Sequence, residues 1–219
     1  MYDLDSRKDI MRLYSDYHQR LTGSYGSERA ILAELLEEET ITGWHATRVL
    51  SADDIAEMGL KAFSREEAFD QFRYLSGVVG LNLGQTETVL QKANHYFAEH
   101  PRRTGCVCFY LLKSMAGQYS KYSATLGGET FAWSLEDAAG AEAVEALKSL
   151  GVSIRVKFAF SFDRIQPYAH DSILSSFIDV LSSNTSTDYC LPKIDGAIVG
   201  SIPPHDILRI EKISKRVAH

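Results

Sequence analysis

The sequence predicts an α+β fold, because helical patterns dominate its first half and strand patterns its second. The clearest strand signal is a strict alternation over Val152–Asp163, where apolar residues take every second position. This period of two predicts a strand with one buried face. A near-continuous apolar run over Cys106–Leu112 predicts a buried strand. Closing strands are predicted over Ala197–Ile202 and Ile207–Ile213. Because strands and helices do not alternate regularly, a parallel βαβ sheet is not expected.

Helical patterns fill most of the first hundred residues. Ser6 and Asp9 resemble a capping box at the start of a first helix, whose apolar residues then recur at helical spacing. A second helix is predicted from Ser27 to Glu38, and further helix between Arg65 and Glu99.

A short strand interrupts these helices at Trp44–Arg48. Ser51 then caps a short helix, and Gly59 stands at its expected end. In the second half, an Ala- and Glu-rich helix is predicted to end near Gly151, and another to begin at Asp171.

The composition is that of one globular domain. Of 219 residues, 45% are hydrophobic and 24% charged, a balance that excludes a disordered chain. No linker or repeat divides it, so residues 1–219 are predicted to form a single domain, with residues 1–40 as a helical N-terminal extension. The N-terminus is charged, and no apolar stretch approaches the roughly 20 residues of a membrane helix. Three cysteines cannot pair completely, and Cys106 and Cys108 fall on one strand face. We therefore expect a cytoplasmic protein with reduced thiols and no membrane attachment.

The charge balance and the missing motifs argue against several classes of function. With 23 basic and 29 acidic residues the net charge is -6, which does not favour general nucleic-acid binding. The sequence has no Walker loop, no GxGxxG after a strand, no HExxH, no paired CxxC and no GxSxG. We therefore expect no metal site and no serine-hydrolase nucleophile.

One group of residues in the sequence does indicate a function. The segment Trp44–Arg48, followed by a capped helix and then Gly59-Leu60, resembles the first catalytic element of the ADP-ribosyltransferase superfamily. Members with a histidine-based active site open it with a strand carrying an aromatic residue, histidine, a small residue and Thr or Ser. A short helix and Gly-Leu follow.

The resemblance assigns roles to four consecutive residues of this strand. It implies that His45 hydrogen-bonds the ribose of NAD and that Thr47 supports it. The backbone around Ala46 would hold the nicotinamide amide, and Arg48 would approach the pyrophosphate.

The segment Tyr122–Trp133 resembles the second element of that family, a strand after a glycine turn whose aromatic ring stacks on nicotinamide. Gly127-Gly128 would permit close approach of the backbone. Either Phe131 or Tyr122 would supply the ring; with Phe131 the tyrosine hydroxyl common in the family is lost.

The third element of the family is a glutamate just before a strand near the C-terminus, which stabilises the oxocarbenium-like state as nicotinamide departs. Asp195 falls at this place, one methylene shorter than glutamate. Glu129, next to the glycine turn, is the competing candidate, and the choice between the two acids stays open.

The resemblance implies an ADP-ribosyltransferase-like split antiparallel sheet with flanking helices over residues 41–219. It further implies an NAD-dependent ADP-ribosyltransferase that modifies a macromolecular target. Such an enzyme would act as a toxin or as a bacterial or phage effector. NAD would be its substrate and a protein its partner, and NAD hydrolysis alone is a variant of this activity. One alternative is a non-catalytic protein-binding or inhibitor domain on the same scaffold. Another is an NAD-using RNA 2′-phosphotransferase, against which the acidic balance weighs.

Overall fold

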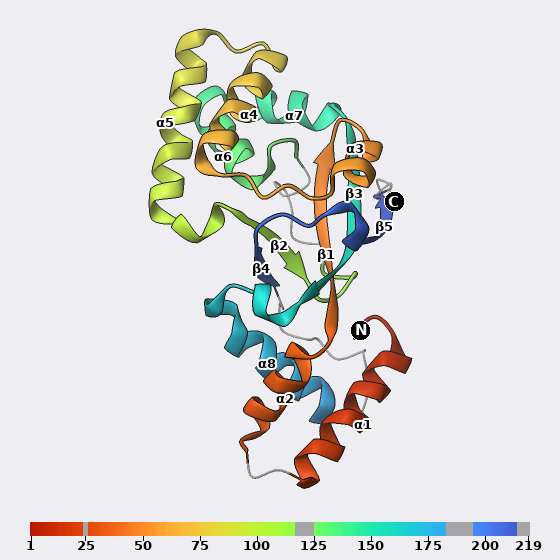
Figure 1. Cartoon of the computed structure of the whole chain (residues 1–219). Coiled ribbons are helices and arrows are strands. Elements are labelled where there is room, and N and C mark those ends of the chain that lie inside the picture. Colours follow the sequence, from red (N-terminus) through yellow and green to blue (C-terminus); the bar gives the residue numbers. More distant parts are fainter. Residues whose placement is uncertain (24–25, 117–124, 183–194, 214–219) are drawn as a thin grey trace.

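The computed structural model describes residues 1–23, 26–116, 125–182 and 195–213, and it has the predicted α+β fold (Figure 1). Its sheet has five antiparallel strands in the order β4-β2-β1-β3-β5. The strands are β1 (Thr40–Val49), β2 (Cys106–Tyr110), β3 (Val152–Ser161), β4 (Asp195–Val199) and β5 (Ile207–Lys212).

Helices lie at both ends of this sheet in Figure 1. The α-helices of the described residues are α1 (Arg7–Gly23), α2 (Glu28–Glu37), α3 (Ala52–Met58), α4 (Arg65–Val78), α5 (Leu83–Glu99), α6 (Gly128–Ala139), α7 (Ala141–Ser149) and α8 (Pro167–Ser182). Short 3-10 helices are η1 (Pro101–Arg103), η2 (Phe162–Arg164) and η3 (Pro204–Asp206). Figure 1 places α4, α5, α6 and α7 beyond one end of the sheet, and α1, α2 and α8 at the other.

Two apolar clusters hold these groups together. The larger one joins one sheet face to α1, α2 and α8, with Phe109, Phe158 and Phe177 fully buried in it. The second lies among α4, α5, α6 and α7, around Phe72 and Phe131. The predicted N-terminal extension is therefore helical, and it packs into the same core as the sheet.

The strand pairing is uneven across the sheet. β1 pairs with β3 over ten residues, from Thr40 opposite Ser161 to Val49 opposite Val152. β1 and β2, in contrast, pair only at Trp44 and Tyr110 among the described residues. Figure 1 shows the two strands close together at this end and diverging toward α3 and α5. The strictly alternating segment forms β3 as far as Ser161, which confirms the predicted strand, and its last two residues begin η2.

A short segment after α3 ties the diverging strands together. Leu60 and Ile202 exchange two backbone hydrogen bonds of 2.9 Å, and Gly105 donates to the Phe63 carbonyl at 2.8 Å. Gly59 ends α3 with a φ of 79°, and its position leaves no room for a Cβ against the Ile202 backbone. The segment thus joins the chain that follows β1 to the chain that follows β4.

Most of the predicted helices are confirmed. Ser51 caps α3, and the Arg65–Glu99 stretch forms α4 and α5. The prediction of a strand after Gly127-Gly128 was wrong, because α6 begins at Gly128. Its residues Ala132 and Leu135 have the spacing of one helix face. The helix predicted to begin at Asp171 starts earlier, at Pro167.

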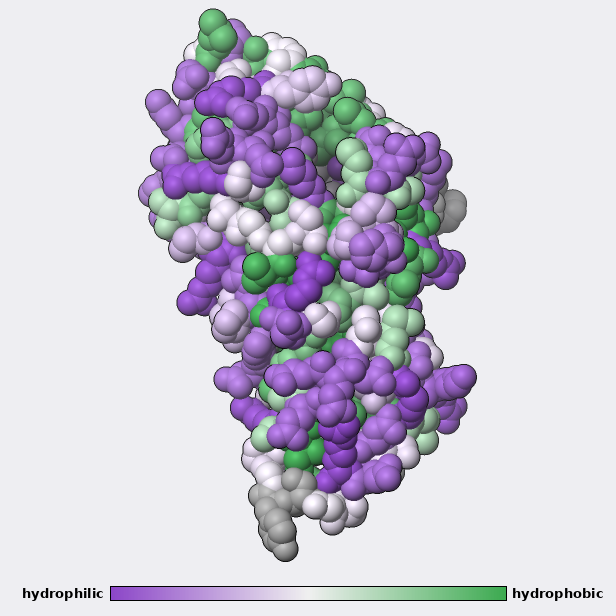
Figure 2. All heavy atoms as spheres, in the orientation of Figure 1, coloured by the Kyte–Doolittle hydropathy of each residue, from purple (hydrophilic) through white to green (hydrophobic). Residues whose placement is uncertain are grey.

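Hydrophilic side chains cover most of the face seen in Figure 2, and hydrophobic atoms gather over its middle, where the sheet lies. Within the described ranges, no helix combines the length and the apolar character needed to cross a membrane.

Candidate functional site

His45 lies in the middle of β1, at the place where β1 and β2 part. Its Nδ1 is 2.7 Å from the carbonyl oxygen of Cys108 on β2. Burial lowers the pKa of His45, and the hydrogen bond to this carbonyl opposes the shift only in part. The ring is therefore neutral near pH 7. Because a carbonyl oxygen can only accept, Nδ1 carries the proton and Nε2 is left as an acceptor.

The His45 side chain is half-buried. Solvent reaches part of its side chain, yet enough protein surrounds the ring to lower its pKa. Cys108 shows the same combination, since its side chain is exposed while burial acts to raise its pKa.

The neighbouring Trp44 fixes the position of β1. Its indole Nε1 donates a 2.5 Å hydrogen bond to Asp5, and the amino groups of Lys113 and Lys157 lie 5.4 and 5.3 Å from its ring. Asp3 pairs with Lys157 on the same side of the sheet. Because a strand turns successive side chains to opposite faces, this anchoring of Trp44 directs His45 away from the charged cluster.

The other three residues of the predicted NAD-binding strand are placed differently. Ala46 is buried beside Trp44, and Thr47 is half-buried. The Arg48 guanidinium donates to the carbonyls of Leu150 and Gly151, at 3.0 and 3.2 Å. Arg48 therefore fastens β1 to the turn that precedes β3.

Both candidate acids lie near β2. Asp195 begins β4 directly opposite Tyr110, while Glu129 lies in the first turn of α6 and pairs with Arg103 at 2.7 Å. Burial is the main cause that raises the pKa of Tyr110, and the charges of Asp195 and Glu129 add to it. Both carboxylates also oppose ionisation of Cys108. The fold thus gathers them around the strand to which His45 is bonded.

The aromatic assignment needs correction. Phe131 is fully buried on α6, and its ring centroid lies 4.9 Å from that of Phe72. A ring enclosed in an apolar core cannot stack on a ligand, so the predicted nicotinamide contact of Phe131 was wrong. Tyr122, the other predicted ring, lies outside the described residues.

Three residues of this site were not assigned to it from the sequence. Tyr110 pairs with Trp44 on one side and with Asp195 on the other, and thus stands between the two strands that carry the predicted catalytic groups. Cys108 and Arg103 complete the set. These residue types are visible in the sequence, but only the order of the strands in the sheet brings the residues together.

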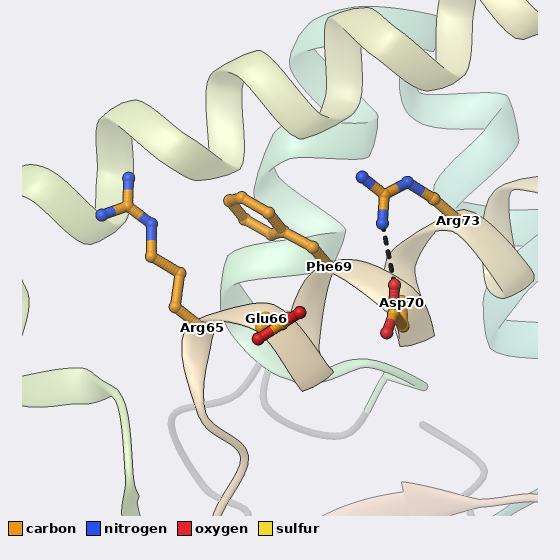
Figure 3. A pocket seen from close by; sticks show the side chains of 5 residues that line it. All are labelled: Arg65, Glu66, Phe69, Asp70 and Arg73. Carbon is orange, nitrogen blue, oxygen red and sulfur yellow. Dashed lines mark hydrogen bonds and ion pairs between the residues drawn. The ribbon is translucent and has the colours of Figure 1, made fainter.

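A separate hollow of about 400 Å³ lies on α4, bordered by both arginines of that helix (Figure 3). The side chains that line it are Arg65, Glu66, Phe69, Asp70 and Arg73. Figure 3 shows Arg73 directed at Asp70, with which it forms a 2.8 Å ion pair. None of the residues predicted to bind NAD lines this hollow, and it is open to solvent. We therefore place the candidate site at His45 rather than here.

In the described ranges, no three His, Cys, Asp or Glu side chains lie close enough to hold a metal ion. Comparison with protein-family models, with curated proteins and with solved structures found no match to this chain.

Proposed function

We propose that the chain is an NAD-dependent ADP-ribosyltransferase with its reactive site at the split between β1 and β2. The observation that carries this proposal is the bond from His45 to the Cys108 carbonyl, because it joins the predicted ribose-binding histidine to the strand beside Asp195. The single pair between β1 and β2 is also what a split antiparallel sheet would require.

The neutral His45 suits the ribose-binding role. With Nδ1 donating to the Cys108 carbonyl, Nε2 accepts a hydrogen bond from a ribose hydroxyl. Its depressed pKa keeps a second positive charge away from a ribose that itself becomes cationic as the bond to nicotinamide breaks.

Asp195 is the better placed acid. Glu129 is neutralised by its ion pair with Arg103, whereas Asp195 is exposed and forms no ion pair with any residue that the structure describes. Asp195 would stabilise the cation until an acceptor group of a protein target bonds to the ribose carbon and releases its proton.

One observation favours a second candidate, a non-catalytic protein-binding domain on this scaffold. Arg48 and Phe131, two of the residues that the resemblance assigns to NAD, are engaged in structural contacts.

Release of free nicotinamide from NAD separates the two candidates. We expect His45→Ala and Asp195→Asn each to slow the release by about 10²–10³-fold, the usual loss when a group that stabilises a developing charge is removed. His95→Ala and Asp171→Asn are matched controls, since both residues are exposed on helices away from β2. Circular dichroism checks that all variants fold. Release that is unchanged by the two site variants, or no release together with no NAD binding, would refute the enzyme and leave the binding domain.

A further inference from the structure

Trp133 on α6 is an exposed tryptophan. It is 46% exposed, whereas Trp44, the other tryptophan of the chain, is only 2% exposed. The Trp133 ring centroid lies 5.5 Å from that of Tyr96 on α5, in an edge-to-face arrangement. Because Tyr96 is itself buried, Trp133 is seated against the protein surface while nearly half of it stays accessible to solvent. Such exposure is uncommon, since a tryptophan side chain gains much from burial.

Trp133 is the middle residue of the exposed stripe of α6. Glu129, Trp133 and Asp137 follow one another at intervals of four residues, so they share one face of the helix, and all three are exposed. The Glu129 carboxylate pairs with Arg103 at 2.7 Å. The Asp137 carboxylate pairs with Lys92 of α5 at 2.6 Å. The indole therefore lies between two ion pairs, each with its acidic member on α6.

This stripe begins beside the candidate site. Glu129 is one of the two carboxylates that lie near β2, and Asp195 is the other. Trp133 stands one turn further along α6, which is roughly 6 Å along the helix axis. A protein segment that packs on Trp133 is therefore presented close to the groups proposed to act on NAD.

The charge of the surrounding helices indicates the chemistry of the partner. Together, α4, α5, α6 and α7 carry ten acidic and four basic residues. This acidic excess equals the net charge of -6 of the whole chain, so the remaining residues are balanced. Such a field attracts a basic partner, and it repels nucleic acid and a second copy of the same helices.

We propose that Trp133 anchors a docking surface for a basic, arginine-bearing segment of the protein target. A guanidinium stacks on an indole face through cation–π attraction, which is strongest with tryptophan. Each carboxylate has about four sites that accept hydrogen bonds, so Glu129 and Asp137 accept bonds from the segment in addition to those of their present partners. Tryptophan and arginine are also enriched among the residues that dominate the binding energy of protein interfaces. That the docked segment belongs to the substrate rests on the proposed function, whereas its binding does not.

Fluorescence anisotropy with a synthetic peptide tests this inference without NAD. The probe is a short fluorescein-labelled peptide in which arginine and glycine alternate, and a peptide with glutamate in place of arginine serves for comparison. We expect the protein to bind only the arginine peptide. Trp133→Ala should weaken this binding by about 2- to 30-fold, the range for the loss of one cation–π contact, and Trp133→Phe, which keeps a ring, should weaken it less.

Tyr74→Ala is the matched control for these variants. Tyr74 is an aromatic residue on α4 that is 60% exposed, and it belongs to the same acidic group of helices. Tyr74→Ala should therefore bind the arginine peptide as the parent protein does. Circular dichroism checks that all variants fold.

The proposal is overturned by equal binding of the arginine peptide to the parent protein and Trp133→Ala, by an equal loss in Tyr74→Ala, or by equal binding of the glutamate peptide. A single-stranded oligonucleotide bound more tightly than the arginine peptide, or a dimer in sedimentation, each lost in Trp133→Ala, would assign the ring to another partner and overturn it as well. Nicotinamide release tests the proposed function separately. Peptide binding that depends on Trp133 without any release would leave the docking surface and remove the enzyme.

Discussion

Replacement of Gly59 by alanine tests how firmly the segment after α3 is held. Gly59 has a φ of 79°, and a Cβ there would overlap the carbonyl oxygen of Ile202. The backbone alone costs an alanine about 1–3 kcal/mol, because a φ of 79° with a ψ of −165° is a conformation essentially restricted to glycine. Relief of the overlap would also break the two hydrogen bonds between Leu60 and Ile202, each of which contributes about 0.5–1.5 kcal/mol. We expect Gly59→Ala to lower the free energy of unfolding by about 2–6 kcal/mol.

Gly80 supplies a matched control for this prediction. It has the same φ of 79°, and a Cβ at its position would meet no atom within 4 Å. Gly80→Ala should therefore cost only the backbone strain, about 1–2 kcal/mol. Urea denaturation measures the free energy of unfolding of both variants. If the two variants lose the same stability to within about 0.5 kcal/mol, the contact with Ile202 contributes nothing and the reasoning is wrong.

Two further changes test other parts of the fold. Phe131→Ala should lower the free energy of unfolding by about 3–5 kcal/mol in urea denaturation, because it removes a fully buried ring; a loss below 1 kcal/mol would contradict this. Glu67→Gln should lower the melting temperature at pH 7, since Lys61 and the Ser64 cap hold the pKa of Glu67 at about 2, below its ordinary 4.5. This contribution is present above pH 4.5 and is lost as the pH falls through 2, so a difference in melting temperature that persists unchanged at pH 2 would refute it.

The parts of the fold that local patterns determine could be predicted. The alternation that became β3 and the Ser51 cap of α3 depend on near neighbours in the chain. At Gly128 the resemblance implies a strand, whereas the helical spacing of Ala132 and Leu135 agrees with the helix that forms there. The local signal was the more reliable guide there.

The candidate site could be predicted only in part, for a physical reason. His45 and Asp195 were selected from the sequence, but no local pattern reveals that β2 lies between β1 and β4. That order of strands, set by packing across the whole sheet, is what brings Tyr110 and Cys108 beside them.

The backbone hydrogen bonds that link the segments around Leu60, Gly105 and Ile202 also affect when the site can form. They join stretches from the first third, the middle and the last tenth of the chain. Contacts so distant in sequence form late, because each must first close a long loop. During synthesis β1 is complete long before Ile202 leaves the ribosome, so a nascent chain carries His45 without the frame that holds it. An unfinished protein of this design would therefore lack the arrangement around His45 until its last strands are made.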